Sequence, residues 1–319
     1  MTAPKRVFSD EELRVASMRS VDALAEALEA GDRSAALRFT RRLQRELRSM
    51  LESYDGWEAT LRSEILRLGG EQDERDALRE LEDPRVAPER CSAEPDAFLR
   101  WRSTAHEIES AIEAGDSHGA LAEASALHDE ALARHDRGMS RVTALLSWIG
   151  RHYGSAAVGT ALEKAMGSGL LGDAGFRERA EALMHFTRVH LQPFALTEDD
   201  EKLTFLCPVC PSGGRLLREG HYEAPRGGLR IEGPSPLTWG RSELPVYCCH
   251  EPVMEKASIE ATGVPLFVVD PSERLGEEPC PTYLYKDPAD IPEHFYTRLG
   301  LTKPASPETA KDKRGSDGR

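Results

Sequence analysis

The residues with the clearest capacity for chemistry are two clusters of cysteine and histidine. The first holds Cys207 and Cys210, and the second holds Cys248, Cys249 and His250. Thiolate sulfur and imidazole nitrogen are the usual protein ligands of structural Zn²⁺, which takes four ligands in a tetrahedron. Two such clusters, joined by a spacer rich in Gly and Pro, can close around one ion. The sequence therefore predicts a zinc site.

Three ligands are common to every arrangement that we consider, namely the two cysteines of the first cluster and Cys248. Either His250 or Cys249 completes a closed set, and closed sets hold structural zinc. If Glu251 or a water molecule takes the fourth place, the site is open and the ion can act as a Lewis acid. A third interpretation, without metal, leaves buried thiols or a redox-active pair.

The first cluster, read in full, is Cys207-Pro208-Val209-Cys210-Pro211-Ser212-Gly213-Gly214. Its Cys-Pro-x-Cys spacing followed by a Gly-rich turn resembles the knuckle of zinc ribbons and rubredoxin-like sites. The resemblance covers residues 207–214 and implies metal binding alone. The second cluster departs from the ribbon pattern, because Glu251 stands where a ribbon would repeat a cysteine. Cys280 is too isolated in the sequence to assign, although it could approach the metal in space.

Two histidines, His128 and His135, fall on the apolar face of a predicted helix. Their spacing is close to two helical turns, so both rings can lean toward one spot, which Asp136 adjoins. In one interpretation each buried imidazole finds a carbonyl or carboxylate and stays inert. In the other they form a metal pair or an acid–base pair, helped by histidines of neighbouring helices: His152, His185 or His190.

Arg215 follows the glycine turn of the first cluster and completes the candidate catalytic set, with His128, His135, Asp136 and Glu251. Converging backbone N–H groups and a forked guanidinium suit a carboxylate or a phosphate, so this turn is a candidate anion site. The alternative is a simple connection between strands.

The histidines depend on a long helical region, which we expect over residues 9–192. Ser9 and Glu12 form a capping-box pattern that predicts one helix reaching Glu29. Helical spacing of apolar residues then predicts a second helix over 36–54, a third over 57–68 and a later one over 174–190.

The helical pattern returns 84 residues later, since Glu113-Ala114-Gly115-Asp116 matches Glu29-Ala30-Gly31-Asp32 and Gly154 matches Gly70. We interpret residues 9–82 and 96–192 as two copies of one multi-helix unit, packed as a bundle and joined by a Pro-containing linker at 83–95. The alternative is a coincidence of composition.

The cysteines lie in a second region, residues 193–303, where short β-prone runs alternate with Gly and Pro turns. The sequence predicts strands there and a short closing helix over 289–299, flanked by tails at 1–8 and 304–319. The expected strands are 203–206, 229–231, 246–247, 266–269 and 283–285. The predicted fold class is therefore α+β, an all-α tandem-repeat bundle followed by a small β-rich metal-binding domain.

Composition argues against a nucleic-acid partner, because the formal net charge is −14 and the pI is near 5.3. We find neither an apolar run long enough to span a bilayer nor the apolar core of a signal peptide near Met1, so we expect a soluble cytoplasmic protein. The sequence also lacks a Walker A loop, a Gly-x-Gly-x-x-Gly fingerprint, a nucleophile elbow and a His-Glu-x-x-His motif.

Three functional hypotheses follow. The first is a zinc-dependent hydrolase or lyase that acts on a small molecule in a pocket between the helical and Cys-rich regions. The second is a non-enzymatic helical interaction protein with a structural zinc site. The third is a thiol redox protein that uses Cys207 and Cys210.

Overall fold

The fold is described here from a computed structural model, which describes residues 6–83, 97–166 and 174–305. Most of the predicted linker at 83–95 and of the predicted tails at 1–8 and 304–319 lies outside these residues. The chain is mostly helical, with a small sheet region after the long helices, so the α+β class is confirmed. None of the helices in the described ranges combines the length and apolar character that crossing a bilayer requires.

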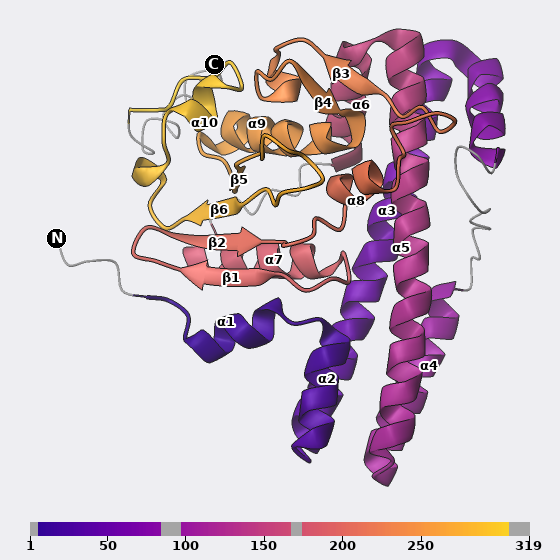
Figure 1. Cartoon of the computed structure of the whole chain (residues 1–319), viewed down its shortest axis with the longest axis vertical. Helices are drawn as coiled ribbons and strands as arrows, with labels where there is room; N and C mark the ends of the chain where they lie inside the picture. Colours follow the sequence, from indigo (N-terminus) through magenta and orange to yellow (C-terminus); the bar gives the residue numbers. More distant parts are fainter. Residues whose placement is uncertain (1–5, 84–96, 167–173, 306–319) are drawn as a thin grey trace, which may run out of the picture.

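Seven helices precede the first strand in the described ranges. Their bounds are α1 Asp10–Ser17, α2 Ser20–Glu29, α3 Arg33–Glu82, α4 Ala97–Ala114, α5 Ser117–Tyr153, α6 Ser155–Met166 and α7 Phe176–Arg188. Helices α3 and α5 run side by side along the long axis of the molecule, and the sheet lies to one side of them (Figure 1).

The first helix begins as predicted and ends early. The Ser9 hydroxyl accepts from the backbone N–H of Glu12, whose carboxylate accepts from the Ser9 N–H, which is a capping box. The prediction of one helix up to Glu29 is wrong, because Met18 is extended (ψ 147°) and separates α1 from α2.

Helix α3 also differs from the prediction, since it runs without interruption where we expected two helices to meet between residues 54 and 57. Asp32 caps its start by accepting a hydrogen bond from the Ala35 N–H at 2.8 Å. The break falls at Gly70, whose φ of 78° is outside the helical range and open to glycine.

Helix α5 has the same punctuation as α3. Asp116 accepts a hydrogen bond from Gly119 N–H at 2.9 Å, and its backbone angles (φ −83°, ψ 76°) are close to those of Asp32 (φ −83°, ψ 82°). Gly154 ends α5 at φ 84°, close to the value at Gly70. These agreements concern the ends of the two helices, and the tandem repeat itself stays a prediction.

The C-terminal region carries six short strands and further helical turns. The strands are β1 Ala195–Glu198, β2 Lys202–Leu206, β3 Arg230–Glu232, β4 Glu243–Pro245, β5 Val268–Val269 and β6 Thr282–Tyr285. The helical elements are α8 Gly213–Arg218, η1 Pro236–Thr238, η2 Val246–Cys249, α9 His250–Thr262, η3 Pro288–Asp290 and α10 His294–Thr297.

Four strands form one antiparallel sheet in the order β1-β2-β6-β5, and β3 pairs with β4 in a second. Of the five predicted strands, those at 203–206, 229–231, 266–269 and 283–285 overlap β2, β3, β5 and β6. The run at 246–247 is wrong, because Val246 and Tyr247 lie in the 3₁₀ turn η2. The predicted closing helix is reduced to η3 and α10. Strand β1 and helix α9 were not predicted.

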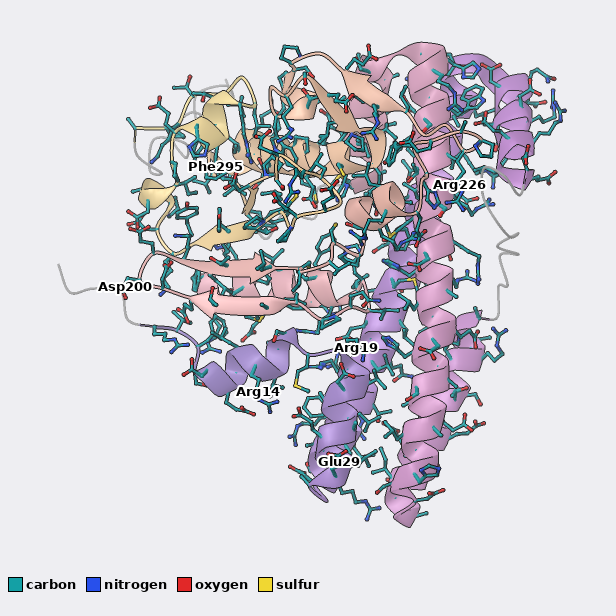
Figure 2. The ribbon with its side chains drawn as sticks, viewed as in Figure 1. Arg14, Arg19, Glu29, Asp200, Arg226 and Phe295 are labelled. Atoms are coloured by element: carbon teal, nitrogen blue, oxygen red, sulfur yellow. The ribbon has the colours of Figure 1, made fainter. Side chains whose placement is uncertain are left out.

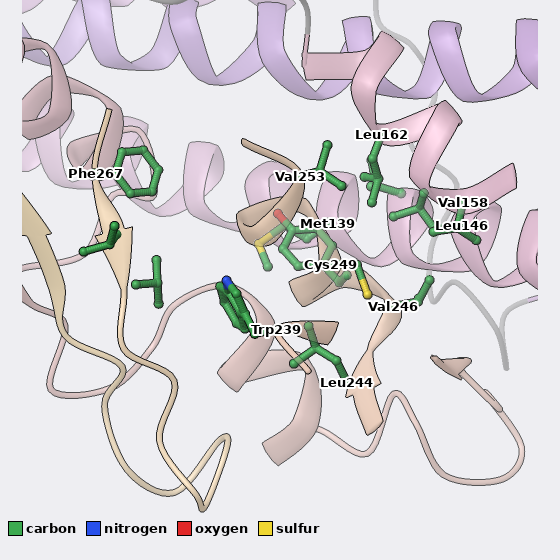
Figure 3. Packing of buried hydrophobic residues seen from close by; sticks show 14 of the residues in the cluster. Met139, Leu146, Val158, Leu162, Trp239, Leu244, Val246, Cys249, Val253 and Phe267 are labelled. Carbon is green, nitrogen blue, oxygen red and sulfur yellow. The ribbon is translucent and has the colours of Figure 1, made fainter. Parts of the chain in front are cut away.

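The hydrophobic core is shared between the long helices and the C-terminal region. One cluster of buried residues joins Leu146 of α5 and Val158 of α6 to Val246, Cys249 and Val253 of η2 and α9 (Figure 3). A second cluster fills the helical arm formed by α2, α4 and the N-terminal halves of α3 and α5. The C-terminal region is therefore packed directly onto α6 and the C-terminal half of α5, which we call the upper helices.

The N-terminal residues are tied to the sheet. The backbone N–H groups of Val7 and Phe8 donate to the two carboxylate oxygens of Glu198 in β1, at 2.8 and 2.9 Å. The Lys286 ammonium also pairs with this carboxylate, at 2.8 Å. Helix α1 follows at once and carries Arg14, and Arg19 marks the turn into α2 (Figure 2).

Candidate functional site

Four cysteines from three segments of the C-terminal region lie close together. Cys207 and Cys210 follow β2, Cys248 lies in η2, and Cys280 precedes β6. The antiparallel register pairs Phe205 with Thr282, so continuing it by two residues places Cys207 opposite Cys280. We call these four residues the thiol cluster. All are partly exposed and none forms a disulfide.

Two glycines of α8 show how closely the sulfur atoms approach the knuckle. A Cβ on Gly213 would lie 2.3 Å from Cys248 Sγ, and a Cβ on Gly214 would lie 3.2 Å from Cys210 Sγ. The backbone N–H of Gly214 also donates to Cys210 Sγ at 3.3 Å. Both sulfur atoms therefore lie against one turn, which needs glycine because a side chain would occupy their space.

The cysteines also affect one another electrostatically. Burial raises the pKa of the Cys207 thiol to about 12, and the charges of Cys210, Glu251 and Cys280 add to the effect. Burial likewise raises the pKa of Cys248, and Cys210, Cys249, Cys280 and Glu251 contribute. A thiol in these surroundings stays protonated unless a cation compensates its charge.

The glutamate beside the cluster has one oxygen satisfied and one unsatisfied. Glu251 Oε1 lies 3.2 Å from His250 Nε2. Glu251 Oε2 is buried and has no hydrogen-bonding partner among the residues that the structure describes. An unpaired buried carboxylate oxygen is costly, and this oxygen is free to accept a hydrogen bond or to bind a cation.

Cys249 and His250, two residues of the predicted zinc set, have other partners than the thiol cluster. Cys249 is fully buried among apolar side chains, with Sγ 3.6 Å from the Pro245 carbonyl oxygen (Figure 3). His250 donates from Nδ1 to the Tyr247 carbonyl oxygen at 2.6 Å, and its Nε2 faces Glu251. Within the described ranges, no three His, Cys, Asp or Glu side chains are arranged as ligands of a metal ion.

A second polar group surrounds His135, which is fully buried in α5. His135 Nδ1 lies 2.9 Å from Asp136 Oδ1, and His135 Nε2 lies 2.9 Å from His190 Nδ1. The Tyr54 hydroxyl of α3 also lies 3.2 Å from His135 Nε2, and 3.4 Å from the Tyr247 hydroxyl. We call Asp136, His135 and His190 the histidine chain.

Protonation states follow from the neighbours. The Asp136 carboxylate can only accept, so His135 Nδ1 carries the hydrogen and Nε2 is left as an acceptor. Burial lowers the pKa of His135 despite the opposing Asp136. The pKa of His190 lies well below its usual range, because of burial and of nearby His135 and His250. Both rings are therefore neutral at pH 7.

Arg215 contacts the carboxylate end of this chain. Its Nε lies 3.2 Å from Asp136 Oδ1, and its Nη2 donates to the Asp136 carbonyl oxygen at 3.1 Å. Its Nη1 pairs with Glu219 at 2.5 Å. Two carboxylates thus occupy the guanidinium, which joins α8 to α5.

His128 is not brought together with His135. Its ring is buried, and neither ring nitrogen has a hydrogen-bonding partner in the described part of the chain. Burial lowers the pKa of His128, and the charged groups that influence it are Arg19, Asp129 and Asp22. It therefore belongs to the helical arm, in a setting separate from the histidine chain.

A cavity of about 320 Å³ lies between α3, α6, α7 and α9. Its lining is mainly apolar and includes Phe186, Val253 and Phe267. Its polar lining includes Ser49 Oγ and His185 Nε2, which are 2.9 Å apart. Residues of both the helical and the C-terminal regions line it, and Val189 on its wall directly precedes His190.

Sequence reasoning named Cys280 and His190 without assigning them to a site, and it missed Tyr54 and Tyr247. Cys280 and His190 carried a signal, since each is of a chemical type that matched the predicted sites. Tyr54 and Tyr247 had no distinguishing signal, because periodicity assigns Tyr54 to a helical core and Tyr247 to a strand.

Comparisons of the chain with protein-family models, with curated proteins and with solved structures found no match. The geometry of the thiol cluster and of the histidine chain is therefore what indicates function.

Proposed function

We propose that this chain is an enzyme that performs acid–base chemistry on a small molecule, by hydrolysis or elimination, with His190 as the general base. One observation carries the proposal, namely the hydrogen-bonded histidine chain buried where the helical and C-terminal regions meet. A buried polar chain of this kind can orient a reactive group.

The direction of the hydrogen bonds identifies the base. Asp136 fixes the proton of His135 on Nδ1, so His135 Nε2 accepts from His190 Nδ1. This leaves the lone pair of His190 on Nε2. A carboxylate that orients a histidine, which then orients the reacting group, is the logic of catalytic triads. His190 Nε2 would take a proton from water or substrate and return it to the leaving group.

The cavity is the proposed place of the substrate, and the histidine chain is connected to it through Val189, which lines it and directly precedes His190. It is lined from both regions, as pockets for small molecules often are, and its apolar walls suit a substrate with a hydrocarbon portion. The Ser49–His185 pair supplies one polar anchor. Chemistry and binding are then carried by neighbouring residues of α7 and its C-terminal turn.

We also propose that the chain binds Zn²⁺, with Cys207, Cys210 and Cys248 as ligands. Supporting this are the shared turn at Gly213 and Gly214 and the unpaired oxygen of Glu251. When bound, zinc would hold the knuckle after β2 against η2, which carries Tyr247 to the histidine chain. The proposed tandem repeat would supply the two long helices, α3 and α5, between which Tyr54 meets His135.

The enzyme proposal is tested with His190→Gln and His135→Gln on a panel of esters, amides, lactones and β-hydroxy acids. We expect each variant to lose about 10²–10⁴-fold in kcat/KM on any compound that the wild type converts. His128→Gln is the matched control, because it removes a buried histidine of the same helix that lies outside the chain, and it should keep the activity.

A second measurement does not depend on a substrate. Ring ¹⁵N chemical shifts of His190 should show a neutral imidazole with hydrogen on Nδ1 at pH 7. A His190 that is protonated at pH 7, or full activity in both chain variants, would contradict the proposal.

A non-enzymatic interaction protein is the second candidate. Phe186 of α7 and Leu99 of α4 are large apolar side chains that remain 41% and 59% exposed and could each contact a partner. In that case the histidine chain is a structural network, and His190→Gln would lower stability alone. The thiol redox hypothesis is less well supported, since burial raises the pKa of Cys207 whereas redox cysteines have lowered values.

A further inference from the structure

We infer that Cys280 is the fourth zinc ligand, so that Cys207, Cys210, Cys248 and Cys280 form a closed tetrathiolate site built from three segments of the chain. This inference rests on the proposed zinc binding and specifies its ligand set. It replaces the sequence-based candidates for the fourth place, which were His250, Cys249 and Glu251.

The sheet register is the first support. Strands β2 and β6 pair with Lys202 opposite Tyr285 and Phe205 opposite Thr282. Extended by two residues beyond the paired strands, this register would place Cys207 opposite Cys280. Residues opposite each other in an antiparallel pair have Cα atoms roughly 4.5–5.5 Å apart, which suits two ligands of one ion.

Backbone donors are the second support. The Gly214 N–H donates to Cys210 Sγ at 3.3 Å, and the Ser272 N–H donates to Cys280 Sγ at 3.4 Å. N–H groups aimed at sulfur stabilise thiolates and orient metal ligands. Cys280 thus has the same kind of support as Cys210 of the knuckle, although the two lie in distant parts of the sequence.

The other candidates are otherwise engaged. Cys249 Sγ faces the Pro245 carbonyl oxygen inside the hydrophobic core. Both ring nitrogens of His250 already have partners, the Tyr247 carbonyl oxygen and the Glu251 carboxylate. Glu251 Oε2 is unpaired, so Glu251 is the remaining competitor and must be tested directly.

A closed thiolate set has a consequence for the reaction. Because four protein ligands fill the tetrahedron, the ion has no position left for water or substrate, as in structural zinc sites. The zinc would hold the ends of β2 and β6 against η2, and the chemistry would belong to the histidine chain.

The test uses the full-length protein loaded with zinc and examined by zinc K-edge X-ray absorption. The wild type should contain one zinc per chain with four sulfur atoms at about 2.3 Å. Cys280→Ser should reduce the sulfur count from four to three. Cys249→Ser, the matched control one residue from a ligand, and Glu251→Gln should both keep four.

Each other outcome has a definite meaning. A wild type with no zinc contradicts the proposed metal binding itself. A wild type with three sulfur ligands and one nitrogen or oxygen ligand preserves zinc binding and overturns the assignment of Cys280. A Cys249→Ser variant that loses one sulfur ligand would do the same in favour of Cys249.

A measurement on the unaltered protein covers the case in which Cys280→Ser does not fold. Maleimide labelling followed by peptide mapping should leave all four cysteines unlabelled with zinc bound and label them together once a chelator removes the metal. Labelling of Cys280 before chelation, while the other three stay protected, would overturn the inference.

Discussion

At the scale of single residues, the histidine chain depends on how closely Tyr54 approaches α5. Gly138 lies one turn after His135, and a Cβ there would lie 2.9 Å from Tyr54 Cγ and 3.0 Å from Tyr54 Cβ. The absence of a side chain at Gly138 therefore lets the tyrosine hydroxyl reach His135 Nε2 at 3.2 Å.

We predict that Gly138→Ala displaces Tyr54 and weakens this hydrogen bond. Overpacking usually costs about 1–3 kcal/mol, and the better helix propensity of alanine returns up to about 1 kcal/mol. The expected net loss is about 1–2 kcal/mol in the free energy of unfolding, measured in urea, with a shifted ¹⁵N resonance of His135 Nε2.

The control for that substitution is Gly56→Ala in α3. Nothing lies within 4 Å of a Cβ at Gly56, and the residue is exposed. This variant should be roughly 0.5–1 kcal/mol more stable than the wild type because alanine favours the helix. Equal effects at Gly138 and Gly56 would show that the contact with Tyr54 is unimportant.

At the scale of elements, Glu64 ties α3 to α6 close to the shared core. Its side chain is 3% exposed and lies 2.5 Å from Arg67 Nη2 and 2.6 Å from Lys164 Nζ. The hydrogen bond from Arg67, with a further contribution from Lys164, lowers the pKa of Glu64 from 4.5 to about 2. A carboxylate with a lowered pKa stabilises the fold above its unfolded-state pKa.

Glu64→Gln should therefore destabilise the protein at neutral pH and have little effect in acid. We expect a loss of about 1–2 kcal/mol at pH 7, because its half-exposed cationic partners are screened by water. The difference from wild type should shrink as the pH falls from 4.5 toward 2. Urea unfolding at several pH values measures this difference. The control is Glu71→Gln, which removes one member of the exposed ion pair between Glu71 and Arg75. A difference that grows in acid would contradict the lowered pKa of Glu64.

Element boundaries show what the sequence could predict. The capping box at Ser9 and the Asp32 and Asp116 caps depend on a few neighbouring residues, and local patterns identify them. Helix α9 was not predicted because its buried face includes Pro252, Glu255 and Ser258, so its sequence has no continuous apolar stripe. Glu255 is buried by pairing with Arg298 at 2.6 Å, which is a long-range contact.

The candidate site, like the element boundaries, was predictable only where it depends on neighbouring residues. The knuckle at Cys207 and Cys210 is local and carries a recognisable spacing. Cys280 joins it through the register of β2 and β6, and His190 reaches His135 from another helix, at 2.9 Å. Neither pairing can be inferred from residue spacing, because each depends on how distant segments meet in the fold.

At the scale of the whole molecule, the shared core makes the upper helices and the C-terminal region interdependent. Ile149 of α5 and Val253 of α9 belong to the same buried cluster. The helical arm has its own cluster, which includes Leu43 and Ile108. Parts that share one core unfold together, whereas a separate core can open alone.

We predict that amides of α9 and of the C-terminal half of α5 exchange hydrogen with the same free energy of opening. Amides of α2 and α4 should open at a lower free energy. Hydrogen-exchange mass spectrometry in graded urea measures both values. Should α9 open well before the upper part of α5, the C-terminal region would be an independent unit after all.

The bonds from Val7 and Phe8 to Glu198 constrain the order of events during synthesis. Their acceptor, a side chain of β1, leaves the ribosome only after all of the long helices have been made. Early helices can form while the chain grows, but this N-terminal segment must wait for its binding site. Its docking therefore cannot precede the synthesis of β1.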